Sequence, residues 1–259
     1  MIPRPVRFLS EDWVATYESQ LHLLWFQSMD LNASLYLLER ITGFPFGVFA
    51  PDDELFWTLV ADALYEKSVM AIWRIAVDSA KDSLTLSHFR DELVRHLKDE
   101  QAKLIVFERL KAAGFDKRMR TIRREVTDLR HQWLAHFNQE VVCGAREFRR
   151  GMPVIPLDRL KAVGEAATEM IGALNLDGGL APTYLDYSGL LGYPLGTDSR
   201  SDIERILDDL AERNGALRMP ESDPELWRGL WQELSEEDRE EFNRYRLRFG
   251  LSDYPVSAE

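Results

Sequence analysis

The sequence predicts an all-α protein, and three observations support this fold class. Apolar residues recur at steps of three and four along several long segments, which is the spacing of one helix face. Helix-start patterns precede two of these segments, at Ser10-Glu11-Asp12-Trp13 and Pro51-Asp52-Asp53-Glu54. Glycine- and proline-containing breaks such as Gly43-Phe44-Pro45 and Gly151-Met152-Pro153 then separate the segments.

Five helices are expected in the first 175 residues. They run from Ser10 to the break at Gly43-Phe44-Pro45, Pro51 to near Asp78, Ser87 to about Ala112, Asp116 to about Gln139, and Pro156 to about Leu174. The first two should pack as a long hairpin. The fourth has the clearest apolar stripe, formed by Met119, Ile122, Val126, Leu129, Trp133 and Phe137.

The rest of the chain predicts two further regions after a bundle of residues 1–175. Residues 176–198 are rich in Gly, Pro and Tyr, and we expect an ordered loop because the aromatic rings favour burial. Residues 199–259 are expected to form a smaller, acidic helical extension. Its aromatic stripe should pack on the bundle or, alternatively, dock a partner; the stripe comprises Trp227, Trp231, Phe242, Tyr245 and Phe249.

Composition excludes several classes of protein. With 45% apolar and 29% charged residues the 259-residue chain is typical of a globular protein. Cys143 is the only cysteine, which excludes an intramolecular disulfide and a cysteine-based zinc site. The sequence shows no signal-peptide pattern and no membrane-spanning apolar run, so a cytoplasmic location without membrane contact is expected. Phosphate-binding glycine loops, zinc-protease motifs and the hydrolase elbow are also missing, and no cofactor or metal is expected.

The charge of the chain is uneven. The net charge is −12, but residues 87–150 hold 15 Lys and Arg against 10 Asp and Glu. A polyanion such as RNA should therefore contact this region, unless the basic excess is simply a solvated helix face. The candidate phosphate-binding residues are Arg118, Arg120, Arg123 and Arg124. Pairing with Glu125, Asp128 or the acidic extension is the alternative, and self-masking by residues 198–259 would then weaken RNA binding.

A short segment of the fourth helix carries groups suited to RNA cleavage. It reads Leu129-Arg130-His131-Gln132-Trp133-Leu134-Ala135-His136-Phe137-Asn138. RNA is cut without a metal when its own 2′-hydroxyl attacks the adjacent phosphorus while a base and an acid move protons. Histidine suits both roles because its pKa lies near neutrality. A guanidinium stabilises the negative charge that gathers on phosphorus.

This segment resembles the HEPN superfamily, in which an arginine, a polar residue, four more residues and a histidine lie near the end of a bundle helix. The residues around this motif are similar to those of the abortive-infection (AbiU-like) group, and so are residues 71–78 and 83–86. The resemblance covers residues 10–175 and implies a HEPN-like up-down bundle. It implies a dimeric, metal-independent endoribonuclease in a toxin or phage-defence setting, with an antitoxin or regulatory partner.

The resemblance also implies residue roles. Arg130 and His136 would be the catalytic pair, with His131 positioning them or the phosphate and Asn138 supporting them. Asn138 stands where some relatives carry a tyrosine, so regulation through that tyrosine does not transfer. In a straight helix Arg130 and His136 lie about 120° apart and about 9 Å along the axis, so one phosphate requires a bend or a partner subunit.

Alternatives remain open for each pattern. His136 lies on the apolar stripe and is equally typical of a core histidine, and Arg130 suits a surface ion pair. Arg90, Asp91 and His96 repeat the motif spacing and form a decoy or a second candidate. The rival function is a non-catalytic helical module that binds RNA or protein.

The third predicted helix also offers a candidate metal site. One helix face would carry Glu92, His96 and Glu100, which are spaced by four, and these side chains could bind a divalent metal. The favoured interpretation is a surface on which these residues form ion pairs with Arg95 and Lys103.

Overall fold

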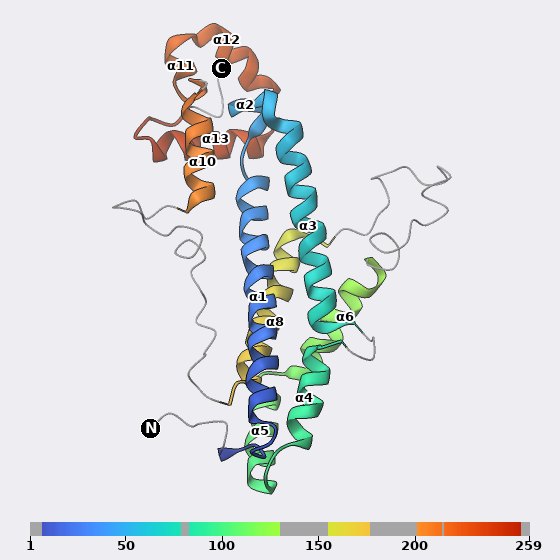
Figure 1. The fold of residues 1–259 in the computed structure, drawn as a ribbon. Helices are drawn as coiled ribbons and strands as arrows, with labels where there is room; N and C mark the ends of the chain where they lie inside the picture. Colours follow the sequence, from blue (N-terminus) through green and yellow to red (C-terminus); the bar gives the residue numbers. More distant parts are fainter. Residues whose placement is uncertain (1–6, 79–82, 130–154, 177–200, 214, 255–259) are drawn as a thin grey trace, which may run out of the picture. The chain divides into compact units, whose positions relative to one another are not determined.

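The computed structural model describes residues 7–78, 83–129, 155–176, 201–213 and 215–254. Within these ranges the chain forms eleven α-helices and two short 3-10 helices, and no β-strand (Figure 1). An isolated antiparallel bridge joins Leu9 to Leu97. The predicted all-α class is therefore confirmed. The chain groups into two compact units, which we describe separately: unit 1 contains residues 1–35 and 64–185, and unit 2 contains residues 36–63 and 186–259.

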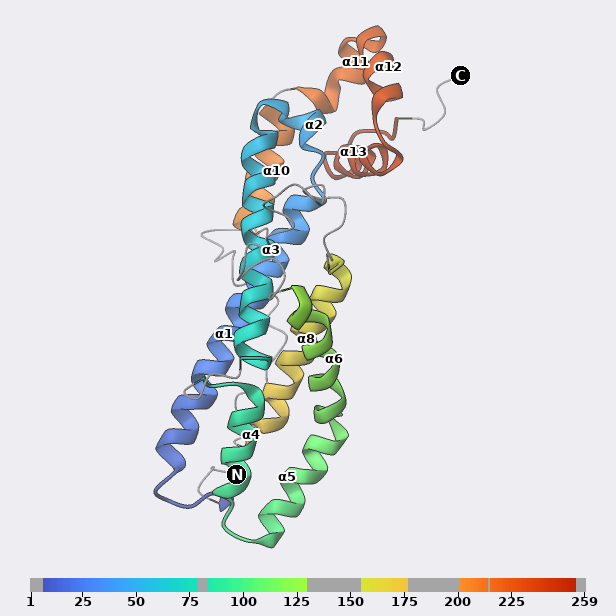
Figure 2. The ribbon, with the colours of Figure 1, turned by 90° about the vertical axis from the view of Figure 1, so that its right-hand side faces the viewer.

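Six helices contribute to unit 1, and two of them continue into unit 2. They are α1 (Val14–Thr42), α3 (Glu54–Ala76), α4 (Leu86–Arg95), α5 (Glu100–Ala112), α6 (Phe115–Leu129) and α8 (Leu157–Leu174). The helix α8 contacts α4, α5 and α6 and is the shared neighbour of the unit (Figure 2). Its buried positions recur at helical spacing, as in Leu160, Val163, Ala167 and Met170.

Close approach of α1 to α8 depends on a glycine. A Cβ atom built on Gly164 would lie 2.8 Å from Cδ1 of Leu35 and 3.1 Å from Oδ1 of Asn32, so a side chain here would have to displace these two side chains. Beside this contact, Asn32 Nδ2 donates to Thr168 Oγ1 at 2.8 Å, and the hydroxyls of Ser28 and Thr168 lie 2.6 Å apart. These hydrogen bonds satisfy the buried hydroxyl of Ser28 and the half-buried polar groups of Asn32 and Thr168.

Two tyrosine hydroxyls hold the chain at both ends of α8. Tyr65 of α3 accepts from the backbone N–H of Ile155 at 2.9 Å, just before α8 begins. Tyr17 of α1 donates to the carbonyl of Leu174 at 3.0 Å and accepts from the N–H of Leu176 at 2.7 Å. Tyr17 is fully buried, and burial raises the pKa of Tyr65. Both hydroxyls thus form hydrogen bonds with backbone groups next to α8, and these groups would lose hydrogen bonds on burial without the tyrosines.

The single helix predicted from Ser87 to Ala112 is wrong, because the chain breaks at residues 96–99. Thr85 caps α4 by accepting from the N–H of His88, and Asp99 caps α5 by accepting from the N–H of Ala102 at 2.8 Å. Between the caps, Lys98 N–H donates to Phe8 O at 2.9 Å. The long-range pairing with the N-terminal segment replaces the missing helical hydrogen bonds.

The predicted serine cap of the first helix is also wrong. Ser10 donates its backbone N–H to the carbonyl of His96 at 3.0 Å, and α1 begins four residues later at Val14. Ser10 therefore takes part in the backbone pairing between the N-terminal segment and residues 96–98 and does not cap a helix.

Unit 2 has an aromatic core built from two distant parts of the sequence. Its own helices are α2 (Phe46–Phe49), α10 (Asp202–Arg213), α11 (Met219–Ser222), α12 (Pro224–Glu233) and α13 (Glu236–Arg248), with the 3-10 helices η2 (Pro51–Asp53) and η4 (Ala216–Arg218). Phe49 stacks on Phe242 with ring centroids 5.6 Å apart, and Phe44 meets Tyr245 edge-on at 5.3 Å. The C-terminal aromatic stripe is therefore used in packing against residues 44–49. The chain breaks between α12 and α13, and Ser235 caps α13 by accepting from the N–H of Asp238.

A buried guanidinium joins the C-terminal helices of unit 2. Arg246 is 2% exposed and donates to the carbonyls of Leu217 and Ser252, the latter at 2.7 Å. Its remaining N–H groups form a fork with both carboxylate oxygens of Glu221. This bidentate arrangement satisfies a charge that would be costly to bury alone.

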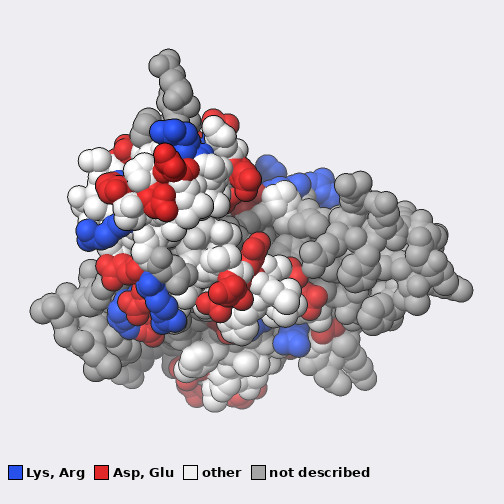
Figure 3. All heavy atoms as spheres, turned by 90° about the horizontal axis from the view of Figure 1, so that it is seen from above, with Lys and Arg blue, Asp and Glu red and all other residues white. Residues whose placement is uncertain are grey.

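The acidity of the chain lies in unit 2. By sequence, unit 2 holds 10 Lys and Arg against 23 Asp and Glu, a net charge of −13. Unit 1 holds 22 against 21, a net charge of +1, and the two values add to the −12 of the chain. Acidic side chains predominate over basic ones among the described residues on the face drawn in Figure 3. A polyanion should therefore avoid unit 2.

Replacing Gly164 with valine should destabilise unit 1 by roughly 1–3 kcal/mol, because the new side chain must displace Leu35 and Asn32. Urea unfolding followed by circular dichroism measures this change. Gly229→Val in α12 is the matched control: a Cβ there meets no atom within 4 Å, and its effect should stay within about 0.5 kcal/mol. Equal losses in the two variants would contradict the close approach of α1 and α8.

Glu221→Gln should lower the free energy of unfolding by about 1–2 kcal/mol at pH 7, a value reduced by the 57% exposure of the Glu221 side chain. The hydrogen bond from Arg246 lowers the pKa of Glu221. This stabilisation is complete above the unfolded-state pKa and is lost as the pH falls through the lowered folded-state value. Unfolding measured from pH 7 down to pH 3 should show wild type and variant converging. A constant difference would reject the ion pair as its source.

Candidate functional site

The first half of the helix predicted to carry the functional motif packs as the sequence indicates. In α6 the side chains of Met119, Ile122 and Val126 are all buried, and Phe115 extends the same stripe towards the N-terminus. These residues belong to the core of unit 1. The predicted register of the helix is confirmed up to Val126.

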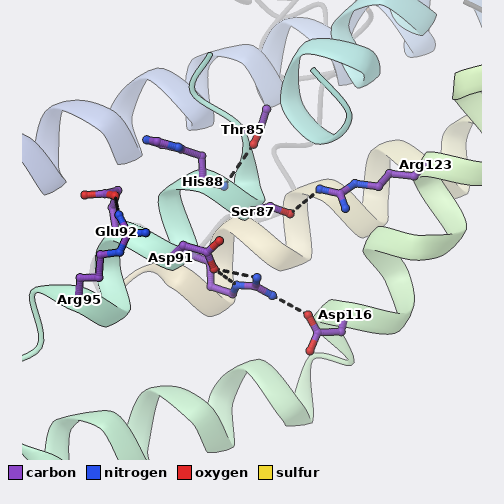
Figure 4. Close-up of polar contacts among 9 residues, drawn as sticks. Thr85, Ser87, His88, Asp91, Glu92, Arg95, Asp116 and Arg123 are labelled. Carbon is purple, nitrogen blue, oxygen red and sulfur yellow. Dashed lines mark hydrogen bonds and ion pairs between the residues drawn. The ribbon is translucent and has the colours of Figure 1, made fainter. Parts of the chain in front are cut away.

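Two of the four candidate phosphate-binding arginines attach α6 to its neighbours. Arg118 forms an ion pair with Glu169 of α8. Arg123 donates to the Ala76 carbonyl at 3.3 Å and to Ser87 Oγ at 3.0 Å, as Figure 4 shows for Ser87. Helix geometry places these arginines about 70° to either side of the buried stripe. They therefore flank the packed face of α6, and their guanidinium groups bind partners within unit 1.

Arg120 and Arg124, the other two arginines, lie on the outward face of α6. Both are exposed, and their spacing of four places them on one side of the helix. Arg120 donates to the backbone carbonyl of Asp116 at 3.3 Å, which leaves its exposed guanidinium facing water. Binding of RNA by these arginines stays a prediction.

The proposed catalytic residues lie outside the described residues. Arg130, His131, His136 and Asn138 all fall in residues 130–154, as does Cys143. The described chain stops at Leu129, the last residue of α6, and resumes at Ile155, which Tyr65 holds. Whether Arg130 and His136 meet is therefore untested and stays a prediction.

The second motif-like set, Arg90, Asp91 and His96, is placed and separately engaged. Arg90 directs its guanidinium to Asp91 and to Asp116 of α6, the latter at 2.5 Å, and lies over the Phe115 ring. His96 stacks on Trp13 with ring centroids 4.8 Å apart and planes inclined by 5°. Because the two side chains have different neighbours, this set serves packing and does not form an arginine–histidine pair.

A cleft of about 750 Å³ lies between α4, α5 and α6, and sequence reasoning did not identify it. Val94, Phe107 and Phe115 contribute apolar surface to it. Its charged lining is mixed, and comprises Arg90, Asp91, Arg95, Glu108, Lys111, Asp116 and Lys117. The mixture of signs favours neither an anionic nor a cationic ligand.

The structure does not support a metal site formed by Glu92, His96 and Glu100 on one helix. The break after Arg95 separates Glu92 in α4 from Glu100 in α5, so the three residues do not share one continuous helix face. Glu92 instead pairs with Arg95, and Glu100 pairs with Lys103 at 2.6 Å. No group of three or more His, Cys, Asp or Glu side chains that could hold a metal ion occurs in the described ranges.

Comparisons with known proteins add no family. No protein-family model, curated protein or solved structure matches this chain. The resemblance of residues 129–138 to HEPN proteins therefore remains an expectation from the sequence. Among the helices of the described residues, none is long and apolar enough to cross a membrane.

Arg123→Ala should cost about 1–2 kcal/mol of unfolding free energy, because it removes hydrogen bonds that join α6 to the end of α3 and the start of α4. Arg120→Ala removes the same charge from the same helix without such contacts. It should change stability by less than about 0.5 kcal/mol. Thermal or urea unfolding distinguishes the two, and similar costs would show that Arg123 does not anchor α6.

Proposed function

We propose that the chain is a metal-independent RNA endonuclease of the HEPN type, with a role in phage defence or as a toxin. The observation that carries the proposal is the motif in residues 129–138, which directly follows the described end of a well-packed α6. The charge division supports it, because unit 1, which contains the motif, lacks the strong negative charge of unit 2.

Elimination of the second motif-like set supports the same residues. Arg90 is held by two carboxylates, and His96 is stacked on Trp13. Of the two arginine–histidine pairs with this spacing, the described one is thus committed to packing. Arg130 and His136 are the pair that the proposal assigns to catalysis.

The chemistry needs only the RNA and these side chains. The 2′-hydroxyl loses its proton to a base and attacks phosphorus, and the bond to the 5′-oxygen breaks as that oxygen gains a proton. His136 acts in proton transfer, and Arg130 stabilises the negative charge on the phosphorane. His131 and Asn138 support this pair. The products carry a 2′,3′-cyclic phosphate and a 5′-hydroxyl.

The proposal includes a homodimer, since two facing copies supply two pairs of these groups. Unit 1 offers exposed apolar side chains suited to self-association: Leu23 and Phe26 of α1 are 49% and 53% exposed, and Leu104 and Phe107 of α5 are 63% and 50% exposed. Apolar surfaces of this kind favour a protein contact. An antitoxin or regulatory protein is the alternative occupant.

A non-catalytic binding module is the second candidate function. The observation that favours it is the use of Arg118 and Arg123 inside unit 1, which reduces the basic surface available to RNA. The two functions differ in one property: a module would bind its ligand without turnover.

RNA cleavage in the presence of EDTA tests the proposal. Wild type should cut single-stranded RNA, whereas Arg130→Ala and His136→Ala should each lower the rate by about a hundredfold or more, because each removes a group that acts in the transition state. Gel analysis of end-labelled RNA gives the rates.

His88→Ala is the matched control, since His88 is an exposed histidine of the same unit, and it should keep the wild-type rate. Equal cleavage by all four proteins would reject this site. RNA binding without cleavage by any of them would favour the binding module.

A further inference from the structure

One face of α3 carries apolar side chains that the fold leaves uncovered. Leu55, Phe56 and Leu59 are 73%, 60% and 58% exposed, and Leu55 is the most exposed large apolar side chain of the described residues. Leu55, Leu59 and the exposed Ala63 are spaced by four, so they form one row along the helix, with Phe56 beside it. We call these four residues the α3 ridge. All four belong to unit 2.

The α3 ridge lies on the side of the helix that faces away from the packed aromatic rings. Trp57 is half-buried and stacks on Phe46 with ring centroids 5.4 Å apart. Helix geometry places Trp57 about 160° around the axis from Leu59. Phe56 meets the Trp57 ring edge-on, with centroids 5.3 Å apart and planes inclined by 79°. The exposed ring of Phe56 is thus held in place by packed neighbours, which lowers the entropy that a partner must remove on binding.

The charge beside the α3 ridge is negative. Asp52 and Asp53 are exposed in η2, directly before α3, and the sequence holds no lysine, arginine or histidine from Gly43 to Ala63. Unit 2 as a whole has a net charge of −13. Such a surface repels RNA and anionic lipid headgroups, and it opposes the pairing of two copies of unit 2. A clustered apolar surface indicates a contact with another macromolecule, and the charge therefore favours a basic protein.

We propose that the α3 ridge docks a basic amphipathic helix of a partner protein. A row of side chains spaced by four packs into the groove between two rows of a second helix. Phe56 and the two leucines supply the buried centre of the contact. Lysine or arginine residues that flank the apolar face of the partner helix meet Asp52 and Asp53, and this charge complementarity identifies the occupant. The inference does not depend on the proposed nuclease function.

Fluorescence anisotropy with the full-length chain tests the proposal. The probe is a fluorescein-labelled synthetic peptide of leucines and lysines, patterned so that the leucines form one helix face. Leu55→Gln/Leu59→Gln should weaken its binding about tenfold, because the variant removes the apolar row while glutamine keeps the helix propensity of leucine. Leu226→Gln/Leu230→Gln is the matched control, since these leucines are also exposed and spaced by four on α12. It should bind within about twofold of wild type.

The charge requirement has its own variants. Asp52→Asn/Asp53→Asn should weaken binding of the leucine–lysine peptide about threefold, because it removes two carboxylates beside the α3 ridge. Asp209→Asn/Glu212→Gln removes the same charge from exposed positions on α10 and should have a smaller effect. A peptide of the same pattern with glutamate in place of lysine should bind wild type about tenfold more weakly than the leucine–lysine peptide.

Four outcomes would overturn the proposal. The first is equal weakening by the two leucine variants, and the second is unchanged binding by Leu55→Gln/Leu59→Gln. The third is equal binding of the lysine and glutamate peptides. The fourth comes from sedimentation velocity of the chain without peptide: a wild-type dimer that Leu55→Gln/Leu59→Gln converts to a monomer would assign the α3 ridge to a second copy. RNA cleavage plays no part in these measurements, so they stand apart from the nuclease proposal.

Discussion

The burial of α8 is the constraint on which unit 1 depends. This helix contacts α4, α5 and α6, and a Cβ atom at Gly164 would displace the side chains of Leu35 and Asn32 of α1. Tyr65 and Tyr17 hold the chain before and after the helix through hydrogen bonds to backbone groups. Removing α8 would therefore expose apolar faces of four helices at once.

This arrangement fixes both ends of the segment that carries the proposed chemistry. The chain enters residues 130–154 from α6, which Arg118 and Arg123 attach to its neighbours. It leaves them at Ile155, which Tyr65 holds. Arginines that the sequence offers as phosphate ligands thus have a mechanical role as well, and the functional argument depends on the residues beyond Leu129 rather than on those before it.

The sequence predicted correctly those features that depend only on residues close to one another along the chain. The stripe of Met119, Ile122 and Val126 predicted the buried face of α6, because helical periodicity alone sets which side chains share a face. The break at residues 96–99 was not predicted, since it depends on backbone pairing with residues 8–10, far away in the sequence. The aromatic core of unit 2 likewise required knowledge that Phe44 and Phe49 meet Tyr245 and Phe242.

The sequence predicts a chemistry for the candidate site, and that chemistry stays a prediction, whereas it does not predict the geometry. The wording of residues 129–138 indicates groups that move protons and bind phosphate, but their convergence depends on tertiary placement. The contacts of Arg118 and Arg123, with Glu169, Ser87 and a backbone carbonyl, join residues that are far apart in the sequence. The cleft of unit 1 was not predicted either, because it is lined by residues of α4, α5 and α6 together.

The central claim is that the RNA supplies its own nucleophile, and the chemistry of the cut ends tests it most directly. An RNA and its fully 2′-O-methylated counterpart are incubated with the protein in EDTA, and the product ends are identified by mass spectrometry. The account predicts cleavage of the unmodified RNA alone, with 2′,3′-cyclic phosphate and 5′-hydroxyl ends. Cleavage of the methylated RNA, or products with 3′-hydroxyl ends, would contradict it.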